Sequence, residues 1–318
     1  MKKIILFGTG NLGKRYLQAI LAANGDFRCF CYDISHEAVD SVDTFLASSN
    51  IPTERLVKRY DLKEVIEDID HWSLVIVAST ANNRFELVSQ IIGRHPEVMI
   101  IEKPVAQTID DFIAIRDACR YTDIPAYTHY TLRFQPFSKT LKKDIDQSMP
   151  FEFTSFLPEM GIACVSIHYI DLFLWLSGVK ESVMTAYVCD GTYEQKRKGF
   201  FDMYGEIVIS NGKCTGRFIN SKLNGMRSFG IVTEEKTVSV YEDQRFMTVL
   251  DKKDKKAPVI SEIEYHFASK YMTRIINNFL QGDINSSGEL VSLDEAFYSH
   301  RVVYEFMEKT GNRELNIT

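Results

Sequence analysis

The sequence predicts an α/β chain of two domains, with a doubly wound parallel sheet first and an α+β domain after it. Over the first 128 residues, short apolar runs alternate with amphipathic stretches, which implies right-handed crossovers and a parallel Rossmann sheet. After about residue 130, strand-like runs are separated by little more than turns. We therefore place the domains at residues 1–128 and 129–318, with the C-terminal helix free to pack back on the first domain.

The elements of the first domain follow from hydrophobic periodicity. The run 74–78 is continuously apolar, as expected of a strand covered on both faces. The predicted strands are 4–7, 27–32, a short one near 55–58, 74–78, 98–101 and 126–129. The predicted helices are 12–23, 39–47, 62–69, 84–94 and 109–121.

The second domain is predicted to hold a largely antiparallel sheet with helices on one face. Asn211-Gly212 is a hairpin signal between two of its strands. We interpret 153–161 as a short link and the charged segment 251–256 as a solvated loop. The predicted strands are 182–189, 206–210, 214–220, 228–233 and 237–241, and the helices are 164–176, 269–280 and 293–308.

Composition limits the class of protein. The net charge of −6 argues against a nucleic-acid partner, since such affinity rests on clustered Lys and Arg. The six cysteines form no CxxC pair, so we expect buried, reduced thiols, no metal site and no disulfide framework. No signal peptide or membrane-spanning run is evident. We expect a cytoplasmic protein that acts on a small molecule.

A glycine-rich turn opens the first predicted helix. Gly8-Thr9-Gly10-Asn11-Leu12-Gly13 fits G-x-G-x-x-G after a strand, and this context gives the pattern its weight. Gly8 permits a tight turn, Gly10 lets a pyrophosphate approach the backbone, and Gly13 lets helix and strand pack closely. The turn therefore predicts a dinucleotide site that includes Asn11 and Leu12.

Asp33 ends the second predicted strand at the place of a ribose-binding carboxylate. Such a carboxylate accepts hydrogen bonds from the adenosine 2′-hydroxyl and repels a 2′-phosphate, so we expect NAD in preference to NADP. His36 nearby would offset part of this charge. The alternative is a Rossmann-like fold without cofactor, in which Asp33 only caps a turn.

Glu102-Lys103-Pro104 follows the fifth predicted strand, at the sheet edge where open α/β sheets bind ligands. By itself this tripeptide is equally compatible with a surface turn.

Taken in order, several segments resemble the glucose–fructose oxidoreductase/inositol dehydrogenase (Gfo/Idh/MocA) family. They are Gly8–Gly13, Asp33, Ala78-Ser79-Thr80-Ala81-Asn82, Glu102-Lys103-Pro104, Arg133-Phe134-Gln135-Pro136 and Gly161 with His168-Tyr169-Ile170-Asp171.

The resemblance implies roles for residues of the first domain. Ser79, Thr80, Asn82 and Glu102 would contact the cofactor together with the glycine turn. Lys103 would lie beside the nicotinamide and assist proton transfer, and the Lys103–Pro104 bond would be cis.

In the second domain the resemblance implies that Tyr130, Arg133 and His168 meet the substrate, with His168 also catalytic. The alternatives are a nearby structural role or a salt bridge across the domain join for Arg133, and a buried, hydrogen-bonded histidine for His168. Asp171, one helical turn from His168, is expected to be structural.

Cys164 stands where relatives carry the Asp of Asp-x-Gly-x-His, so the Lys–Asp–His arrangement is incomplete. Cys164 would be a core residue, a wall of the substrate pocket or, least favoured, a nucleophile.

Three functions are compatible with these features. The favoured one is NAD-dependent hydride transfer at a secondary alcohol or ketone of a sugar, cyclitol or nucleotide-linked sugar. The second is a non-catalytic NAD- or sugar-binding regulator on the same fold. The third is reduction of a C=N or C=C bond in a non-sugar substrate.

The family also implies a homo-oligomer, a dimer or tetramer, formed through an open face of the second sheet. Candidate apolar positions for that face are Val183, Ala186, Val188, Ile207 and Ile209, unless they face the domain's own helices.

Overall fold

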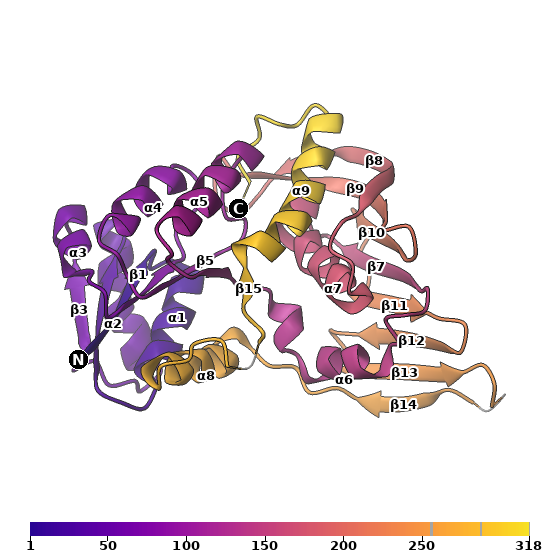
Figure 1. The fold of residues 1–318 in the computed structure, drawn as a ribbon, viewed down its shortest axis with the longest axis horizontal. Coiled ribbons are helices and arrows are strands. Elements are labelled where there is room, and N and C mark those ends of the chain that lie inside the picture. The colour runs from indigo at the N-terminus through magenta and orange to yellow at the C-terminus, as the bar shows by residue number, and fades with distance from the viewer. Residues whose placement is uncertain (255–256, 287, 318) are drawn as a thin grey trace. The chain divides into compact units, whose positions relative to one another are not determined.

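The chain divides into two compact units (Figure 1). The computed structural model describes residues 1–254, 257–286 and 288–317. The first unit comprises Met1–His129 with His266–Asp294, and the second comprises Tyr130–Tyr265 with Glu295–Thr318.

The segment 266–294, which we expected in the second domain, belongs to the first unit. Helix α8 (Ala268–Leu280) packs on α1 (Asn11–Leu21), where Thr273 Oγ1 donates a hydrogen bond of 3.1 Å to the Ala19 carbonyl. Strand β15 (Val291–Ser292) then pairs with the edge strand β6 (Ala126–Thr128). The segment 266–294 thus packs against the first unit because α1 offers an apolar face to α8 and β6 offers a free strand edge to β15. Helix α9 (Leu293–Lys309) lies almost wholly in the second unit.

The first unit contains a seven-stranded sheet in the order β15-β6-β5-β4-β1-β2-β3, in which only β15 is antiparallel to its neighbour. This confirms the predicted doubly wound parallel sheet. Its other strands are β1 (Lys2–Phe7), β2 (Phe27–Tyr32), β3 (Leu56–Arg59), β4 (Ser73–Val77) and β5 (Val98–Ile101). The other helices are α2 (His36–Ser48), α3 (Leu62–Asp68), α4 (Arg84–Ile92) and α5 (Ile109–Tyr121).

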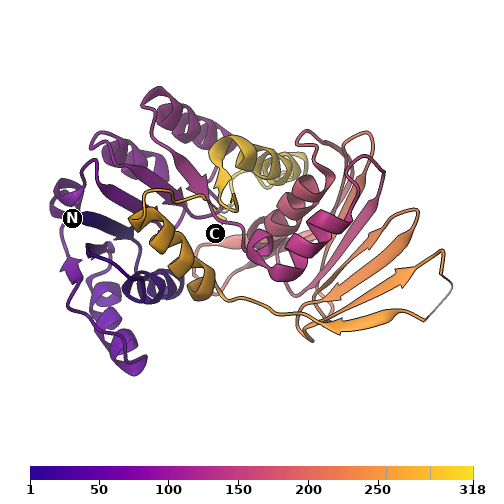
Figure 2. The same ribbon diagram turned by 60° about the horizontal axis from the view of Figure 1, so that its bottom comes forward.

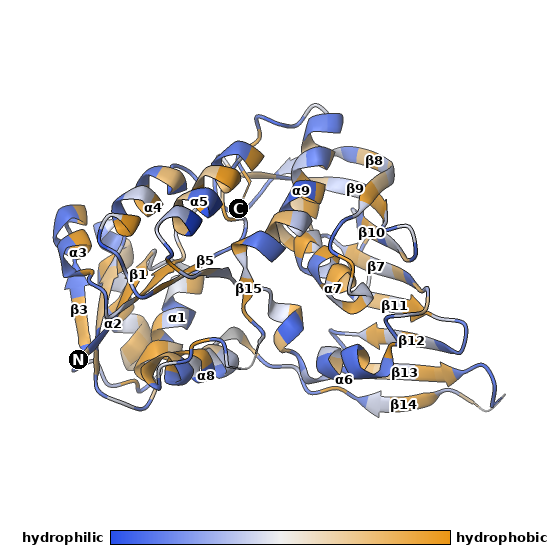
Figure 3. Cartoon of the chain, viewed as in Figure 1, coloured by the Kyte–Doolittle hydropathy of each residue, from blue (hydrophilic) through white to orange (hydrophobic). Residues whose placement is uncertain are grey.

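Burial explains the central strands of this sheet. Every residue of β4 and β5 is buried, because helices cover both faces and the strands carry almost only aliphatic side chains (Figure 3). Polar side chains fix where helices begin. Ser35 Oγ accepts the Ala38 amide at 3.2 Å at the start of α2, and Thr108 Oγ1 accepts the Asp111 amide at 3.1 Å at the start of α5.

The second unit contains an eight-stranded sheet in the order β14-β13-β12-β11-β7-β10-β9-β8. Only β7 and β10 pair in parallel, so the prediction of a largely antiparallel sheet is confirmed. The strands are β7 (Glu152–Pro158), β8 (Val183–Glu194), β9 (Phe201–Ser210), β10 (Thr215–Ser221), β11 (Ser228–Val232), β12 (Lys236–Tyr241), β13 (Phe246–Asp251) and β14 (Val259–Glu262).

Helices α6 (Pro136–Asp144), α7 (Ile167–Ser177) and α9 lie along one face of this sheet, and no described helix covers the other (Figures 1 and 2). A 3₁₀ turn η1 (Thr131–Phe134) precedes α6, and a π-helical turn η2 (Ile162–Ser166) precedes α7. Buried aromatic rings fill the space beneath the helices. The rings of Phe153 and Phe229 stack with centroids 5.4 Å apart.

The interpretation of 153–161 as a short link was wrong. Residues 152–158 form β7, the strand between β10 and β11. Its inward positions are Phe153, Ser155 and Leu157, and the polar Ser155 interrupts the apolar alternation that would have revealed a strand. Helix α6 and strands β13 and β14 were also missed. Of the predicted loop 251–256, Asp251 ends β13, and residues 255–256 lie outside the described part of the chain.

The five candidate interface positions separate into two groups. Val183, Ala186 and Val188 on β8 are exposed. Ile207 and Ile209 are fully buried within the unit, so including them in an open face was wrong. Within the described residues, no helix has the length and hydropathy needed to cross a bilayer.

Gly13 is required by close packing between α1 and the turn before it. A Cβ at Gly13 would lie 1.9 Å from the Gly8 carbonyl oxygen, a backbone atom that cannot move without displacing the turn. We expect Gly13→Ala to destabilise the chain by about 1–3 kcal/mol in urea unfolding. Gly93→Ala is the matched control, because its Cβ would meet nothing nearer than 3.5 Å. Equal stabilities of the two variants would contradict this packing.

Candidate functional site

Five strand ends of the first sheet lie in one row at its carboxyl edge. The register pairs Tyr32 with Phe7, Phe7 with Val77, Val77 with Ile101, and Ile101 with Thr128. The residues that follow these strands are therefore brought side by side. They are Asp33, Gly8, Ala78, Glu102 and His129.

The glycine turn is shaped by contacts that exclude side chains. Gly8 has a φ of +98°, and a Cβ on it would lie 2.6 Å from the Ser79 amide nitrogen. Gly10 caps α1 without a side chain, and the Lys14 amide donates to its carbonyl at 2.9 Å. Asn11 and Leu12 follow in the exposed first turn. The helix N-terminus and the close backbone approach fit a dinucleotide pyrophosphate.

Asp33 joins the glycine turn to the loop after β2. Its carboxylate accepts the Thr9 amide at 2.7 Å and the Ser35 amide at 3.0 Å. Asp33 thus caps this turn, and it remains half-buried at the row of strand ends. His36 turns elsewhere: its Nε2 lies 3.2 Å from the Tyr60 carbonyl oxygen.

Arg84, which the sequence analysis did not single out, holds two of these strand-end turns together. This buried guanidinium donates to the carbonyls of Glu102, at 2.6 Å, and Pro104, and to the Ser79 carbonyl. The sequence contained a signal for the burial of Arg84, because this residue lies one helical turn before the buried Val88 on the inward face of α4.

Glu102 is buried and linked to two side chains of the first unit. Tyr16 donates its hydroxyl hydrogen to Oε1, which also lies 3.1 Å from His129 Nδ1, and the Lys103 amide donates to Oε2 at 3.2 Å. Burial opposes ionisation, but His129 and Tyr16 hold the pKa of Glu102 below its usual value. Its carboxylate therefore fixes the direction of the chain at Lys103.

Lys103 is half-buried at the same edge, and the Lys103–Pro104 peptide bond is cis, as predicted. Three more predicted cofactor contacts, Ser79, Thr80 and Asn82, lie in the loop after β4. Asn82 accepts a hydrogen bond of 2.6 Å from Gln107 Nε2. The predicted residues of the first unit are thus assembled along one sheet edge.

In the second unit, Tyr130 and His168 are adjacent. Their rings meet edge to face with centroids 5.8 Å apart. Tyr130 is fully buried, and its hydroxyl lies 2.6 Å from Ser299 Oγ and 3.1 Å from His300 Nδ1. Tyr130 therefore presents its ring to His168 and its hydroxyl to α9.

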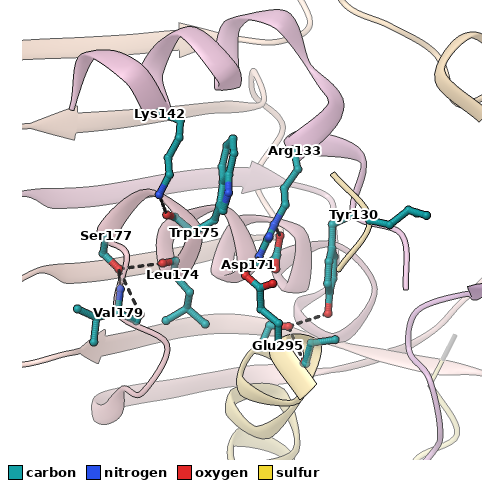
Figure 4. A network of polar contacts seen from close by, with 12 residues as sticks. Tyr130, Arg133, Lys142, Asp171, Leu174, Trp175, Ser177, Val179 and Glu295 are labelled. Atoms are coloured by element: carbon teal, nitrogen blue, oxygen red, sulfur yellow. Dashed lines mark hydrogen bonds and ion pairs between the residues drawn. The ribbon is translucent and has the colours of Figure 1, made fainter. Parts of the chain in front are cut away.

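Arg133 is buried in an ion pair, shown in Figure 4. Its Nε and one terminal nitrogen each donate to Asp171 at 2.7 Å, and Glu295 lies 3.0 Å away. Burial raises the pKa of Asp171 to about 6 despite the adjacent guanidinium. The alternative weighed for Arg133 was a salt bridge across the domain join, whereas this ion pair with Asp171 and Glu295 lies within the second unit.

Cys164 lies at the start of the helix that carries His168, beside a carboxylate that the sequence analysis missed. The fully buried Asp202 of β9 accepts the amides of Ala163, at 2.8 Å, and Cys164, at 2.9 Å. A Cβ on Gly161 would lie 1.9 Å from Asp202 Cγ, so glycine is required there. Asp202 follows Phe201 at the beginning of β9, in a stretch where we predicted no strand.

Comparison with known proteins supports the resemblance. Residues 2–128 match the family model GFO_IDH_MocA, described as an oxidoreductase family with an NAD-binding Rossmann fold. No significant match was found among curated protein sequences.

Three solved structures show how far the fold is shared. Levoglucosan dehydrogenase in complex with NADH and L-sorbose is 14% identical with a TM-score of 0.75, and the match covers 98% of this chain and 97% of that one. UDP-N-acetylglucosamine 3-dehydrogenase GnnA from Acidithiobacillus ferrooxidans is 13% identical with a TM-score of 0.70, covering 98% and 99%. A super-repressor mutant of Gal80p from Saccharomyces cerevisiae is 12% identical with a TM-score of 0.72, covering 98% and 95%.

At these identities the structural likeness concerns the fold alone. Residues 2–128 therefore match an oxidoreductase family with an NAD-binding Rossmann fold, and nearly the whole chain shares the two-domain fold of solved oxidoreductases.

Proposed function

We propose that the chain is an NAD-dependent oxidoreductase that transfers hydride to or from a secondary alcohol or ketone of a sugar, cyclitol or nucleotide-linked sugar. The observation that carries the proposal is the row of strand ends that aligns Asp33, the Gly8 turn and Glu102-Lys103 in the first unit. The sugar ligand of levoglucosan dehydrogenase and the sugar substrate named for GnnA support the substrate class.

In this proposal the glycine turn and the start of α1 hold the pyrophosphate, and Asp33 accepts hydrogen bonds from the adenosine ribose. Bound NAD supplies or accepts the hydride. Lys103 Nζ exchanges a proton with the reacting oxygen, while Arg84 and Glu102 hold the turn that carries Lys103.

His168 is proposed to bind or to protonate the substrate, with Cys164 at the wall of the same site. Because its guanidinium is paired with Asp171 and Glu295, Arg133 is proposed to position the helix of His168 rather than to serve as an open anion site. Tyr130 acts in the same way through its ring contact with His168.

A second function is favoured by one observation. Cys164 occupies the position of the Asp that relatives use beside the lysine, and the likeness to a super-repressor mutant of Gal80p extends over nearly the whole chain. A non-catalytic regulator would bind NAD without turnover. Incubation with NADH or NAD and a panel of sugars distinguishes the two, because oxidation or reduction of the cofactor supports the enzyme.

Replacement of Asp33 tests the cofactor site. We expect Asp33→Ala to raise the Kd for NADH about tenfold, because one charged acceptor for the ribose hydroxyls is lost, and to reduce discrimination against NADPH. Fluorescence titration measures both affinities. The matched control is Asp43→Ala, a largely exposed carboxylate of α2 paired with Lys58. An unchanged preference for NADH in Asp33→Ala would contradict the role of Asp33.

Replacement of Lys103 tests the chemical step. We expect Lys103→Met to lower kcat by a factor of about 10²–10⁴ on a sugar that the panel identifies, with the Kd for NADH nearly unchanged. The control is Lys63→Met, an exposed lysine of α3. Turnover at the parent rate in Lys103→Met would reject proton transfer by Lys103.

We also propose that the chain forms a dimer or tetramer through the open face of the second sheet. Val183 and Val188 are 69% and 52% exposed, which favours burial against a second copy. Light scattering should give a mass at least twice 36.5 kDa, and the double variant Val183→Glu/Val188→Glu should lower it. Tyr121→Glu, at an exposed position of the first unit, should leave the mass unchanged. A monomeric parent chain would rule out the oligomer.

A further inference from the structure

Strands β8 and β9 form a hairpin at one edge of the second sheet (Figure 1). This hairpin carries aromatic and cationic side chains that the hydride-transfer proposal leaves unused. The rings of Tyr193 and Tyr204 stack with centroids 4.4 Å apart and planes 18° from parallel. Lys222, just beyond β10, places Nζ 5.9 Å from the Tyr204 ring centroid. The hairpin turn adds the exposed run 196–198, which reads Lys-Arg-Lys. We call these residues the hairpin cluster.

The hairpin cluster adjoins the start of the helix that carries His168. Gln195 Nε2 donates to Asp202 at 3.1 Å, and Asp202 accepts the amides of Ala163 and Cys164. Burial, with the charge of Asp202 nearby, raises the pKa of Tyr193 above its usual value, so its hydroxyl stays neutral. A ligand whose sugar lies against Cys164 and His168 can therefore extend along this hairpin.

The charge of the hairpin cluster contrasts with that of the whole chain. The hairpin turn and the residue after β10 together carry four cationic side chains in a protein of net charge −6, and Arg197 of the turn lies over the Phe200 ring at 5.5 Å. Two acidic side chains near these cations already have other contacts or are out of solvent. Glu194 accepts a hydrogen bond from the Gly199 amide at 2.7 Å, and Asp202 is buried. Lys222 donates to the Asp190 carbonyl, a contact that a phosphate oxygen can replace.

A basic run alone is most often a solvated turn. Here residues from three strands converge: a stacked ring from each of β8 and β9, and a lysine from the end of β10. Stacked tyrosines accept planar bases, and flexible cations accept phosphate. The combination fits a group that has both a base and a diphosphate.

We propose that the hairpin cluster is the subsite for the nucleoside diphosphate portion of the substrate, which makes the substrate a nucleotide-linked sugar. This inference rests on the proposed oxidoreductase function and narrows its substrate class.

Calorimetric titration of the full-length chain, with NADH saturating the dinucleotide site, tests the subsite. The probes are UDP, inorganic pyrophosphate and uridine. We expect UDP to bind best, pyrophosphate more weakly and uridine least, with an affinity for UDP that falls as salt rises. Lys222→Ala should weaken UDP at least about fivefold, and the triple variant Lys196→Ser/Arg197→Ser/Lys198→Ser should weaken it further.

Two variants test the aromatic part. Tyr204→Leu should weaken UDP several-fold and leave pyrophosphate unchanged, whereas Tyr204→Phe should retain the parent affinity because the ring remains. The matched charge control is Lys252→Ser/Lys253→Ser, which removes exposed cations from the far side of the same sheet.

The outcomes separate this inference from the proposed function. No binding of UDP, or UDP binding that is unchanged in Lys222→Ala, overturns the subsite. Equal affinities for UDP and pyrophosphate, with no effect of Tyr204→Leu, overturn the nucleotide assignment. Loss of NADH binding in the parent chain would instead overturn the oxidoreductase proposal, whatever UDP does.

Discussion

The arrangement of the first unit depends on strand register at one edge of a parallel sheet. The carboxyl ends of β2, β1, β4, β5 and β6 are in register, so the short loops that follow these strands lie side by side. Neighbouring turns must then pack backbone against backbone. Gly8 accordingly lies so close to Ser79 that a Cβ on Gly8 is excluded. A slip of one residue in any pair would move Asp33 or Lys103 out of the row and reverse the faces of that strand.

Buried polar groups convert that row into a defined surface. Taking an arginine or a carboxylate out of water is costly unless hydrogen bonds replace the lost hydration. Arg84 meets this condition with the carbonyls of two turns, and Glu102 meets it with Tyr16 and His129. Each group is thereby held in one geometry. In the second unit the buried Arg133 is likewise compensated by charged partners. Its ion pairs with Asp171 and Glu295 connect η1 to α7 and α9.

The sequence contained the fold of the first unit because its signals are local. Apolar runs and glycine spacing are read directly along the chain, and they predicted the sheet and the turn, whereas the cis bond before Pro104 was expected from the family resemblance. Contacts between distant segments were not readable in the same way. The docking of α8 on α1, the buried Ser155 of β7 and the carbonyls around Arg84 depend on which surfaces meet, and residue type alone does not encode that. Asp202 was missed for the same reason.

Asp202 also bears on how a chain with Cys164 could handle protons. By the family resemblance, Cys164 stands where an acid is expected on the helix, and Asp202 of β9 places a carboxylate beside this position. Yet Asp202 is fully buried and accepts N–H groups from Ala163, Cys164, Met203 and Gln195, which makes it a helix cap. Its two oxygens are occupied by these four N–H groups, which hold the start of the helix in place. Asp202 is therefore not among the groups that we propose for proton transfer, which are Lys103 and His168.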